Sequence, residues 1–200
     1  MNEQERFWAG KFGTDYCQRN NTGKLLESNM VMFADIIPQC RGISTVLECG
    51  CNIGLNLEAI HLVNPALHLS GFDINPEAVK IANRLDYAYV YESSFADFYT
   101  DEKFDLVFTK GVLIHIHPDN LQATYKKMFD LSSKYILVAE YYNTKPVGID
   151  YRGEQWKLWK RDFAGDLMEH FGVRLVDYGF VYHRGLYPQD DISWFLLTKE

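Results

Sequence analysis

Apolar runs of strand length recur between residues 45 and 198, and helix-length segments separate the first five of them. The runs cover residues 45–48, 67–72, 88–91, 104–109, 135–140, 174–182 and 193–198. Strands that alternate with helices form a parallel sheet covered on both faces. The last two runs have no helix between them, which predicts a hairpin. We therefore expect an α/β fold with a seven-stranded, mostly parallel sheet, helices on both faces and an antiparallel C-terminal hairpin.

Two short motifs follow the first two runs, and each carries an acid. Residues 46–54 read Val-Leu-Glu-Cys-Gly-Cys-Asn-Ile-Gly, so Glu48 ends an apolar run and a glycine-containing turn follows it. Asp73 ends the second run, three residues before Pro76. An acid at this second position can accept hydrogen bonds from the ribose hydroxyls of an adenosine cofactor, and glycines let the backbone approach the ligand. The structural alternative is that Glu48 caps the turn and Asp73 caps the helix that begins near Pro76.

The turn itself selects the kind of cofactor. A dinucleotide fingerprint requires Gly-x-Gly-x-x-Gly, whereas this turn has a carboxylate at the strand end, which repels a pyrophosphate and suits a cationic ligand. Residues 46–54, 71–76 and 104–117 resemble motifs of the class I S-adenosylmethionine-dependent methyltransferases. The resemblance implies a Rossmann-like fold with the cofactor at the carboxyl ends of the first strands. Asn52 departs from the family pattern, which most often has glycine there, but asparagine tolerates a left-handed backbone.

The resemblance places the cofactor contacts at strand ends and in the turns that follow them. It implies that Glu48 lies near the cofactor's ammonium, that Asp73 binds the ribose and that Lys110 begins the segment along the methionine end. The expected cofactor-binding residues are Glu48, Gly50, Cys51, Asn52, Gly54, Asp73, Ile74, Ser94, Phe95, Lys110, Gly111 and Val112. The expected cofactor is S-adenosylmethionine, with S-adenosylhomocysteine as its product, and no metal is expected.

Methyl transfer from a sulfonium is an in-line displacement, so the protein mainly has to align the acceptor and exclude water. A hydroxyl acceptor needs a base and an amine acceptor needs only prior deprotonation, and both stay open. His115 lies where many small-molecule members of the family carry a histidine that faces the transferred methyl, and Glu140 ends the fifth run. These two are the expected catalytic residues. The alternatives are a core histidine and a polar cap on the strand.

Two segments lie outside the alternating region. Residues 1–40 are rich in aromatic residues and contain an expected helix at 22–37; we interpret them as an N-terminal helical lid, or as packing on the sheet edge. Residues 141–163 exceed an ordinary connection and are interpreted as an acceptor-side insertion. Its basic residues either clamp a carboxylate or phosphate or belong to a solvated amphipathic helix. The expected substrate-binding residues are Tyr16, Tyr141, Tyr142, Arg152, Lys157 and Arg161.

Composition limits the class of protein. A chain of 200 residues with 47% hydrophobic content can bury one core, so we expect residues 1–200 to form a single methyltransferase domain. The net charge of −7 disfavours nucleic-acid binding, because such proteins usually display a basic face. No apolar run approaches the roughly 20 residues that span a bilayer, and the cysteines lack a paired Cys-x-x-Cys. We expect a soluble, cytoplasmic protein without membrane contact, disulfides or structural zinc.

A second resemblance covers most of the chain. Residues 7–13, the motifs above and residues 140–163 together are similar to the methyltransferases associated with pseudaminic acid biosynthesis. This resemblance implies a small acidic acceptor, a sugar or nucleotide-sugar in bacterial surface glycan synthesis. Two alternatives stay open: methylation of a protein or peptide, which predicts an open groove, and a cofactor-binding sensor or partner protein without catalysis. The acceptor and the oligomeric state also stay open.

Overall fold

The computed structural model describes residues 1–19, 23–151 and 153–199. The α-helices are α1 (Glu3–Ala9), α2 (Lys11–Arg19), α3 (Gly23–Ile36), α4 (Leu55–Val63), α5 (Pro76–Ala82), α6 (Leu121–Leu131) and α7 (Phe163–Phe171). The strands are β1 (Thr45–Cys49), β2 (His68–Asp73), β3 (Ala88–Glu92), β4 (Phe104–Lys110), β5 (Ser132–Glu140), β6 (Val147–Tyr151), β7 (Glu154–Lys160), β8 (Arg174–Val181) and β9 (Ile192–Thr198). Short 3₁₀ turns are η1 (Ile37–Gln39), η2 (Leu113–His115) and η3 (Pro118–Asn120).

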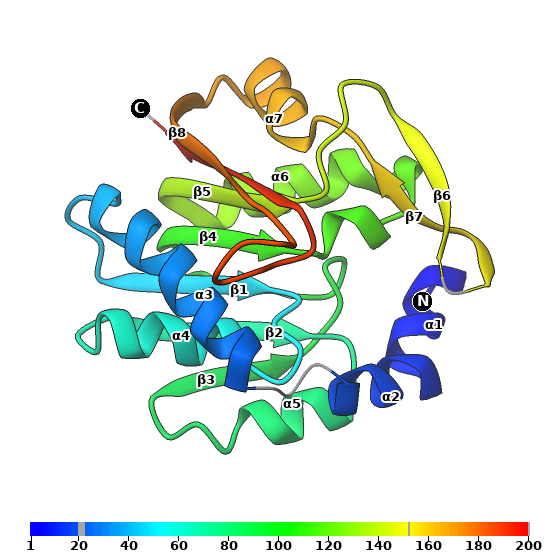
Figure 1. Ribbon diagram of the computed structural model, residues 1–200, viewed down its shortest axis with the longest axis horizontal. Helices are drawn as coiled ribbons and strands as arrows, with labels where there is room; N and C mark the ends of the chain where they lie inside the picture. The colour runs from blue at the N-terminus through cyan, green and yellow to red at the C-terminus, as the bar shows by residue number, and fades with distance from the viewer. Residues whose placement is uncertain (20–22, 152, 200) are drawn as a thin grey trace.

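Seven strands form one sheet in the order β3-β2-β1-β4-β5-β9-β8 (Figure 1). The five strands β3, β2, β1, β4 and β5 run parallel to one another. Strand β9 is antiparallel to both β5 and β8. The expected mostly parallel sheet with an antiparallel C-terminal hairpin is confirmed. The strand order reverses at β1, which pairs with β2 on one side and β4 on the other. Open α/β sheets bind ligands at the carboxyl ends of strands beside such a switch point.

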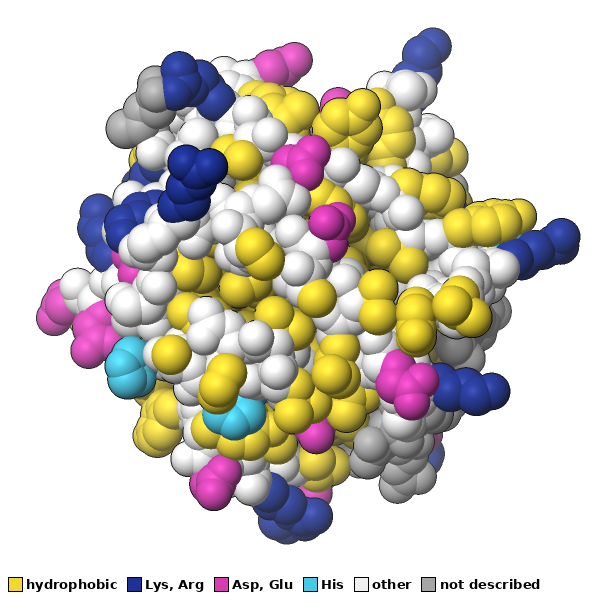
Figure 2. Space-filling model, turned by 60° about the vertical axis from the view of Figure 1, so that its left-hand side comes forward, with side chains coloured by type: hydrophobic (Ala, Val, Ile, Leu, Met, Phe, Trp, Pro, Cys, Tyr) yellow, Lys and Arg dark blue, Asp and Glu magenta, His cyan; other side chains and the backbone are white. Residues whose placement is uncertain are grey.

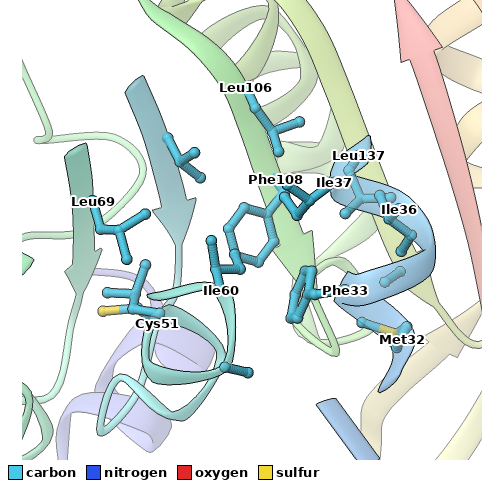
Figure 3. Packing of buried hydrophobic residues seen from close by; sticks show 14 of the residues in the cluster. Met32, Phe33, Ile36, Ile37, Cys51, Ile60, Leu69, Leu106, Phe108 and Leu137 are labelled. Carbon is cyan, nitrogen blue, oxygen red and sulfur yellow. The ribbon is translucent and has the colours of Figure 1, made fainter. Parts of the chain in front are cut away.

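Helices cover both faces of the sheet, and each face buries its own apolar cluster. On one face Phe33 of α3 and Ile60 of α4 pack around Phe108 of β4, as Figure 3 shows. On the other face Tyr125 of α6 and Leu167 of α7 belong to the second cluster. Both faces of the central strands are therefore buried, which is why these strands are near-continuous apolar runs in the sequence.

Two connections differ from the sequence-based expectation. Residues 93–103, between β3 and β4, contain no helix, although a helix-length segment was expected to form one. The expected insertion at residues 141–163 is mostly a hairpin, because β6 and β7 pair antiparallel in a separate two-stranded sheet. The alternative of an amphipathic helix is therefore wrong. Lys157, Leu158 and Trp159 are all buried, because β7 packs against η2 and against α1.

The N-terminal helices α1 and α2 lie beside the carboxyl ends of the strands, next to the β6–β7 hairpin (Figure 1). Phe7 and Phe12 stack with ring centroids 4.1 Å apart, and Phe12 contacts Tyr151 of β6 with centroids 6.2 Å apart. The helix expected at 22–37 is α3, with residue 22 outside the described residues. The aromatic residues near the chain start therefore join the N-terminal helices to the hairpin.

The outer strand β8 leaves large side chains uncovered. Tyr178 and Phe180 of β8, and Tyr182 directly after it, are 66%, 59% and 47% exposed, so no helix of the described residues covers these rings. Figure 2 shows hydrophobic side chains spread over the face it presents, with most lysine and arginine side chains near its margin. Among the helices of the described residues, none combines the length and apolar character needed to cross a bilayer.

Candidate active site

A cavity of about 1050 Å³ opens at the carboxyl ends of the central strands. Its walls come from the turns after β1, β2, β3 and β4, from α1 and α2, and from the loop between β8 and β9. The sequence-predicted residues that line it are Tyr16, Gly50, Cys51, Asn52, Asp73, Ile74, Ser94, Phe95, Lys110, Gly111, Val112, His115 and Tyr141. Ligand pockets usually measure about 300–1000 Å³, so this one has room for a cofactor and a second small molecule.

The turn after β1 is built on a left-handed backbone. Gly50 and Gly54 have φ values of 78° and 82°, and Asn52 has φ of 47°. A Cβ on Gly50 would lie 2.8 Å from Val112, so only glycine permits the approach of this turn to the segment after β4. The Asn52 N–H donates to Asp73 Oδ2 at 2.7 Å. The turn therefore accepts asparagine at its departure from the family pattern. Gly54 does not line the cavity and instead begins α4.

Asp73 ends β2 with its carboxylate held on both oxygens. Oδ2 accepts the Asn52 N–H, and Oδ1 accepts the Asn75 N–H at 2.8 Å. The side chain is 9% exposed and burial raises its pKa. The helix that begins at Pro76 is capped by the Asn75 side chain. Asp73 is thus not the helix cap, and each of its oxygens retains a lone pair toward the cavity wall it helps to form.

Glu48 is fully buried behind the turn and does not line the cavity. Its Oε1 accepts a hydrogen bond from Asn56 Nδ2 at 2.6 Å, and no partner is described for the buried Oε2. Burial raises the pKa of this carboxyl to about 8, although the nearby ammonium of Lys110 favours the ionised form. A contact of Glu48 with the cofactor stays a prediction, and burial favours the neutral form of this carboxyl behind the turn.

The segment after β4 is held by Glu140 from the neighbouring strand. Glu140 Oε1 accepts the N–H groups of Val112 and Leu113, both at 3.0 Å, and Oε2 accepts that of Ile114 at 3.4 Å. Glu140 is 2% exposed and is not among the cavity-lining residues, although it was expected to be catalytic. Its carboxylate is occupied by backbone donors, so this position suits a positioning residue better than an acceptor-contacting one. Gly111, with φ of 67°, starts the supported segment.

His115 lines the cavity and is buried at 7% exposure. Its Nδ1 lies 2.8 Å from the carbonyl oxygen of Lys157. A carbonyl oxygen can only accept, so Nδ1 carries the proton and Nε2 keeps its lone pair. Burial lowers the pKa of the imidazole to about 4, which keeps it neutral. The rings of Trp8 and Tyr151 pack on either side of it, with centroids 4.5 and 4.9 Å from its own.

Ser94 and Phe95 lie at the predicted adenine end of the cavity. The Ser94 hydroxyl donates to Asp97 Oδ2 at 2.7 Å and accepts the Asp97 N–H at 3.1 Å. Phe95 packs edge-on against Phe72, with ring centroids 5.1 Å apart. The pair therefore offers one polar and one apolar side chain, and its contact with a nucleobase stays a prediction.

The expected anion clamp is not assembled from the described residues. Lys157 Nζ pairs with Glu3 Oε1 of α1 at 2.7 Å, and Arg161 Nε pairs with Asp166 of α7 at 2.8 Å. Neither side chain lines the cavity, and Arg152 lies outside the described residues. Tyr142 also lies away from the cavity, 40% exposed beside Phe195. The two described cations are neutralised by carboxylates of other elements, which local sequence does not reveal.

Several cavity-lining residues are absent from the sequence-based set. They include Trp8, Asn75, Tyr151, His183, Gln189 and Asp190. His183 Nδ1 lies 2.8 Å from Asp191 Oδ1, and Asp191 has a left-handed φ of 54°. The aromatic density of residues 7–16 was a usable signal for Trp8. No local signal identifies His183, because the β8–β9 loop reaches the cavity only through the antiparallel pairing of β9 with β5.

The sheet order and the cavity at its switch point define a Rossmann-like methyltransferase fold. A family model described as a methyltransferase domain matches residues 47–133, the part of the chain that carries the β1 turn, Asp73 and the segment after β4. The comparison with curated proteins gives no significant match.

Solved methyltransferase structures share the fold across almost the whole chain. Magnesium protoporphyrin IX methyltransferase from Synechocystis PCC 6803, with bound S-adenosylhomocysteine, has a TM-score of 0.72 at 14% identity, covering 98% of each chain. The plantazolicin methyltransferase BpumL, also with this product, has a TM-score of 0.68 at 12% identity over 98% of this chain and 94% of that one. A Burkholderia thailandensis 1,6-didemethyltoxoflavin-N1-methyltransferase has a TM-score of 0.69 at 14% identity, covering 94% and 82%.

These findings support the expected methyltransferase resemblance and the expected cofactor. The neighbours were solved with S-adenosylmethionine or S-adenosylhomocysteine bound. The resemblance to the pseudaminic acid clade is not tested by them and stays a hypothesis.

Proposed function

We propose that this protein transfers a methyl group from S-adenosylmethionine to a small-molecule acceptor. The observation that carries the proposal is the cavity at the switch point, which brings together the β1 turn, Asp73 and the segment after β4. The match of residues 47–133 to a methyltransferase domain supports it. When bound, S-adenosylmethionine supplies a methyl group on a positively charged sulfur.

The residues of the cavity fit such a cofactor. Asp73 is fixed by two backbone N–H groups and retains lone pairs for the two ribose hydroxyls. At Gly111 an added Cβ would meet no atom within 4 Å, so the backbone itself borders open space there. Glu48 is buried behind the turn, and a cationic amino group bound there would favour the ionised form of its carboxyl. Ser94 and Phe95 would bind the nucleobase.

The acceptor side offers one buried imidazole and several aromatic rings. His115 presents the Nε2 lone pair, which can accept a hydrogen bond from an acceptor hydroxyl or amine and so orient the attacking atom. Because burial holds its pKa near 4, the imidazole is a weak base and its orienting role is the stronger one. Tyr16 and Tyr141 line the same cavity and would pack against the acceptor. Glu140 acts on this side through the backbone that it holds.

A small acceptor is favoured over a peptide. The helices α1 and α2 contribute Trp8, Gly13 and Tyr16 to the walls, and β6 contributes Tyr151, so the cavity is bounded on the side away from the sheet. A peptide methyltransferase needs an open groove along which a chain can lie. We interpret residues 1–40 as the lid of a small-molecule site, within one domain that spans residues 1–200.

The identity of the acceptor is a finer proposal. We propose an acidic sugar or nucleotide-sugar of bacterial surface glycan synthesis, supported by the resemblance to the pseudaminic acid clade. Because Lys157 and Arg161 have carboxylate partners, Lys110 is the sequence-predicted cation that lines the cavity and could face an acidic group. Screening acidic against neutral sugars with radiolabelled cofactor separates the finer proposal from the coarser one.

The first test is calorimetric titration of S-adenosylhomocysteine into the wild type, Asp73→Asn and the control Asp35→Asn on α3. Asp73→Asn replaces one carboxylate acceptor with an amide, so we expect binding to weaken about tenfold or more, as for the loss of a hydrogen bond to a charged group. The exposed Asp35 lies on α3 outside the cavity walls, so its variant should bind like the wild type. A folded wild type that does not bind S-adenosylhomocysteine would contradict the proposed function.

A further inference from the structure

Asn75 connects the turn after β2 to the N-terminal helices. Its Oδ1 caps α5 by accepting the N–H groups of Glu77 and Ala78, both at 3.1 Å. Its Nδ2 faces the α1–α2 junction, where three carbonyl oxygens and one hydroxyl oxygen surround it. These are the carbonyls of Trp8 at 3.0 Å, Ala9 at 3.4 Å and Gly10 at 3.3 Å, and Thr14 Oγ1 at 3.3 Å. Helix capping alone would use only the oxygen of this side chain.

The junction is closely packed against Asn75. The side chain is 2% exposed, and a Cβ on Gly13 would lie 2.8 Å from Asn75 Nδ2 and 1.9 Å from the Trp8 carbonyl oxygen. The last carbonyl oxygens of a helix have no partner within it, so the two N–H donors of the Asn75 amide supplement the bonds at this junction, where the Gly10 carbonyl also accepts from Thr14. The position of α1 and α2 therefore depends on one side chain of the β2 turn.

The same turn carries the predicted ribose-binding acid. The backbone N–H of Asn75 donates to Asp73 Oδ1 at 2.8 Å. Asn75 therefore both holds the predicted ribose-binding acid and contacts the N-terminal helices. A second contact joins α2 to the β1 turn, where Asn52 Nδ2 lies 3.7 Å from Cys17 Sγ. Cys17, Ile53 and Ala78 form a small buried cluster between these elements. The N-terminal helices thus rest on both turns that the cofactor would contact.

We propose that Asn75 is a positioning residue that couples cofactor binding to docking of the N-terminal helices. This inference rests on the proposed function. Trp8, Gly13 and Tyr16 line the cavity with α1 and α2 docked as the structure shows them. A ligand that orders Asp73 and its turn favours the docked helices, and the docked helices favour the ligand by the same factor, because coupling between two equilibria is reciprocal.

The test uses a substitution that keeps the helix cap and removes the amide. Asn75→Ser retains an oxygen of a residue type that caps helices as well as asparagine, adds no charge and removes the amide nitrogen that contacts the lid carbonyls. Gly13→Ala disturbs the same junction from the lid side, because its added Cβ would meet the Trp8 carbonyl oxygen and the Asn75 amide. Hydrogen exchange of the peptide covering residues 3–19 measures docking, and calorimetry with S-adenosylhomocysteine measures binding. The full-length protein is used throughout.

We expect bound S-adenosylhomocysteine to slow exchange in residues 3–19 of the wild type. Each variant should exchange faster there and bind about tenfold more weakly, and the double variant should bind no more weakly than either single one, because both break one junction. Faster exchange with affinity within twofold of the wild type would overturn the coupling, as would weaker binding with unchanged exchange. If Asn75→Ser does not fold, Gly13→Ala alone decides by the same criteria. Failure of the wild type to bind would instead remove the proposed function, and the coupling with it.

Discussion

At the scale of single residues, the cavity depends on side chains whose hydrogen bonds fix other groups. Asn52 occupies a left-handed conformation, φ 47°, at a position where the resembled family most often has glycine. Its N–H is held by Asp73, so a residue that tolerates this conformation is sufficient and glycine is not required. The departure from the family pattern therefore leaves the turn intact. Sequence reasoning could anticipate this outcome, because the conformational tolerance of asparagine is intrinsic to the residue.

His115 gives the sharpest prediction at this scale. Its pKa is about 4 in the folded protein, below the ordinary value of about 6.5, because burial disfavours the imidazolium. Between these values the unfolded chain binds a proton that the folded one does not, so the stability from neutral His115 is present above pH 6.5 and is lost as pH falls toward 4. We expect the wild type to lose up to about 3 kcal/mol relative to His115→Gln over this range.

Urea unfolding of both proteins at half-unit steps from pH 6.5 to 4 measures this difference. The glutamine variant is the matched control, because its amide can still donate to the Lys157 carbonyl while it does not titrate. Parallel stability curves would contradict a buried, neutral His115.

At the scale of elements, the sequence was sufficient to predict the strands of the main sheet but not the structure of the insertion at residues 141–163. Every strand of the main sheet overlaps an apolar run, and the central strands are apolar throughout because they are buried on both faces. The β6–β7 hairpin was missed, since residues 154–160 mix aromatic and basic residues in a pattern that an amphipathic helix also shows. The deciding contact of Lys157 is with Glu3, at the other end of the chain. Pairing at such a sequence separation cannot be deduced from local spacing.

The same limit applies to Glu140. Its position at a strand end suggested catalysis, whereas its described contacts are backbone N–H groups of η2 and the residue before it. The sequence identifies the acid, but it does not determine which groups the side chain of this acid contacts.

Glu140→Ala should destabilise the protein by about 3 kcal/mol or more, because it leaves buried N–H groups without an acceptor at about 1–3 kcal/mol each. Glu140→Gln should recover most of this loss, since the amide oxygen still accepts and the cost of a buried charge disappears. Denaturant unfolding at pH 7 measures both variants. If the alanine and glutamine variants are equally destabilised, η2 requires the negative charge of Glu140 and not only a hydrogen-bond acceptor. A loss below about 1 kcal/mol for alanine would contradict the bracing role.

At the scale of the whole molecule, buried acids dominate the region behind the cavity. Glu48 has a pKa of about 8 and Glu140 of about 7, both raised by burial, and Lys110 between them has a pKa lowered to about 8. The unfolded chain releases the carboxyl protons near pH 4.5, so the folded state holds more protons from there up to the folded pKa values. Stability from these acids is therefore full below about pH 4.5 and is lost as pH rises through 7 and 8.

This loss should be visible above pH 6.5, where His115 no longer opposes it. Lys110, whose pKa is lowered, opposes this loss near pH 8, so the test compares two proteins. We expect the free energy of unfolding of the wild type to decrease relative to that of Glu48→Gln between pH 6.5 and 8, because the neutral amide can still accept from Asn56 without titrating. Urea unfolding at four pH values in this window measures both slopes.

Equal slopes would show that Glu48 titrates at its ordinary value, and the buried negative charge would then be present at neutral pH without the cofactor. A steeper fall in the wild type would mean that the carboxyl is largely protonated until a cationic group arrives, so binding of S-adenosylhomocysteine should release a proton, detected as a buffer-dependent heat.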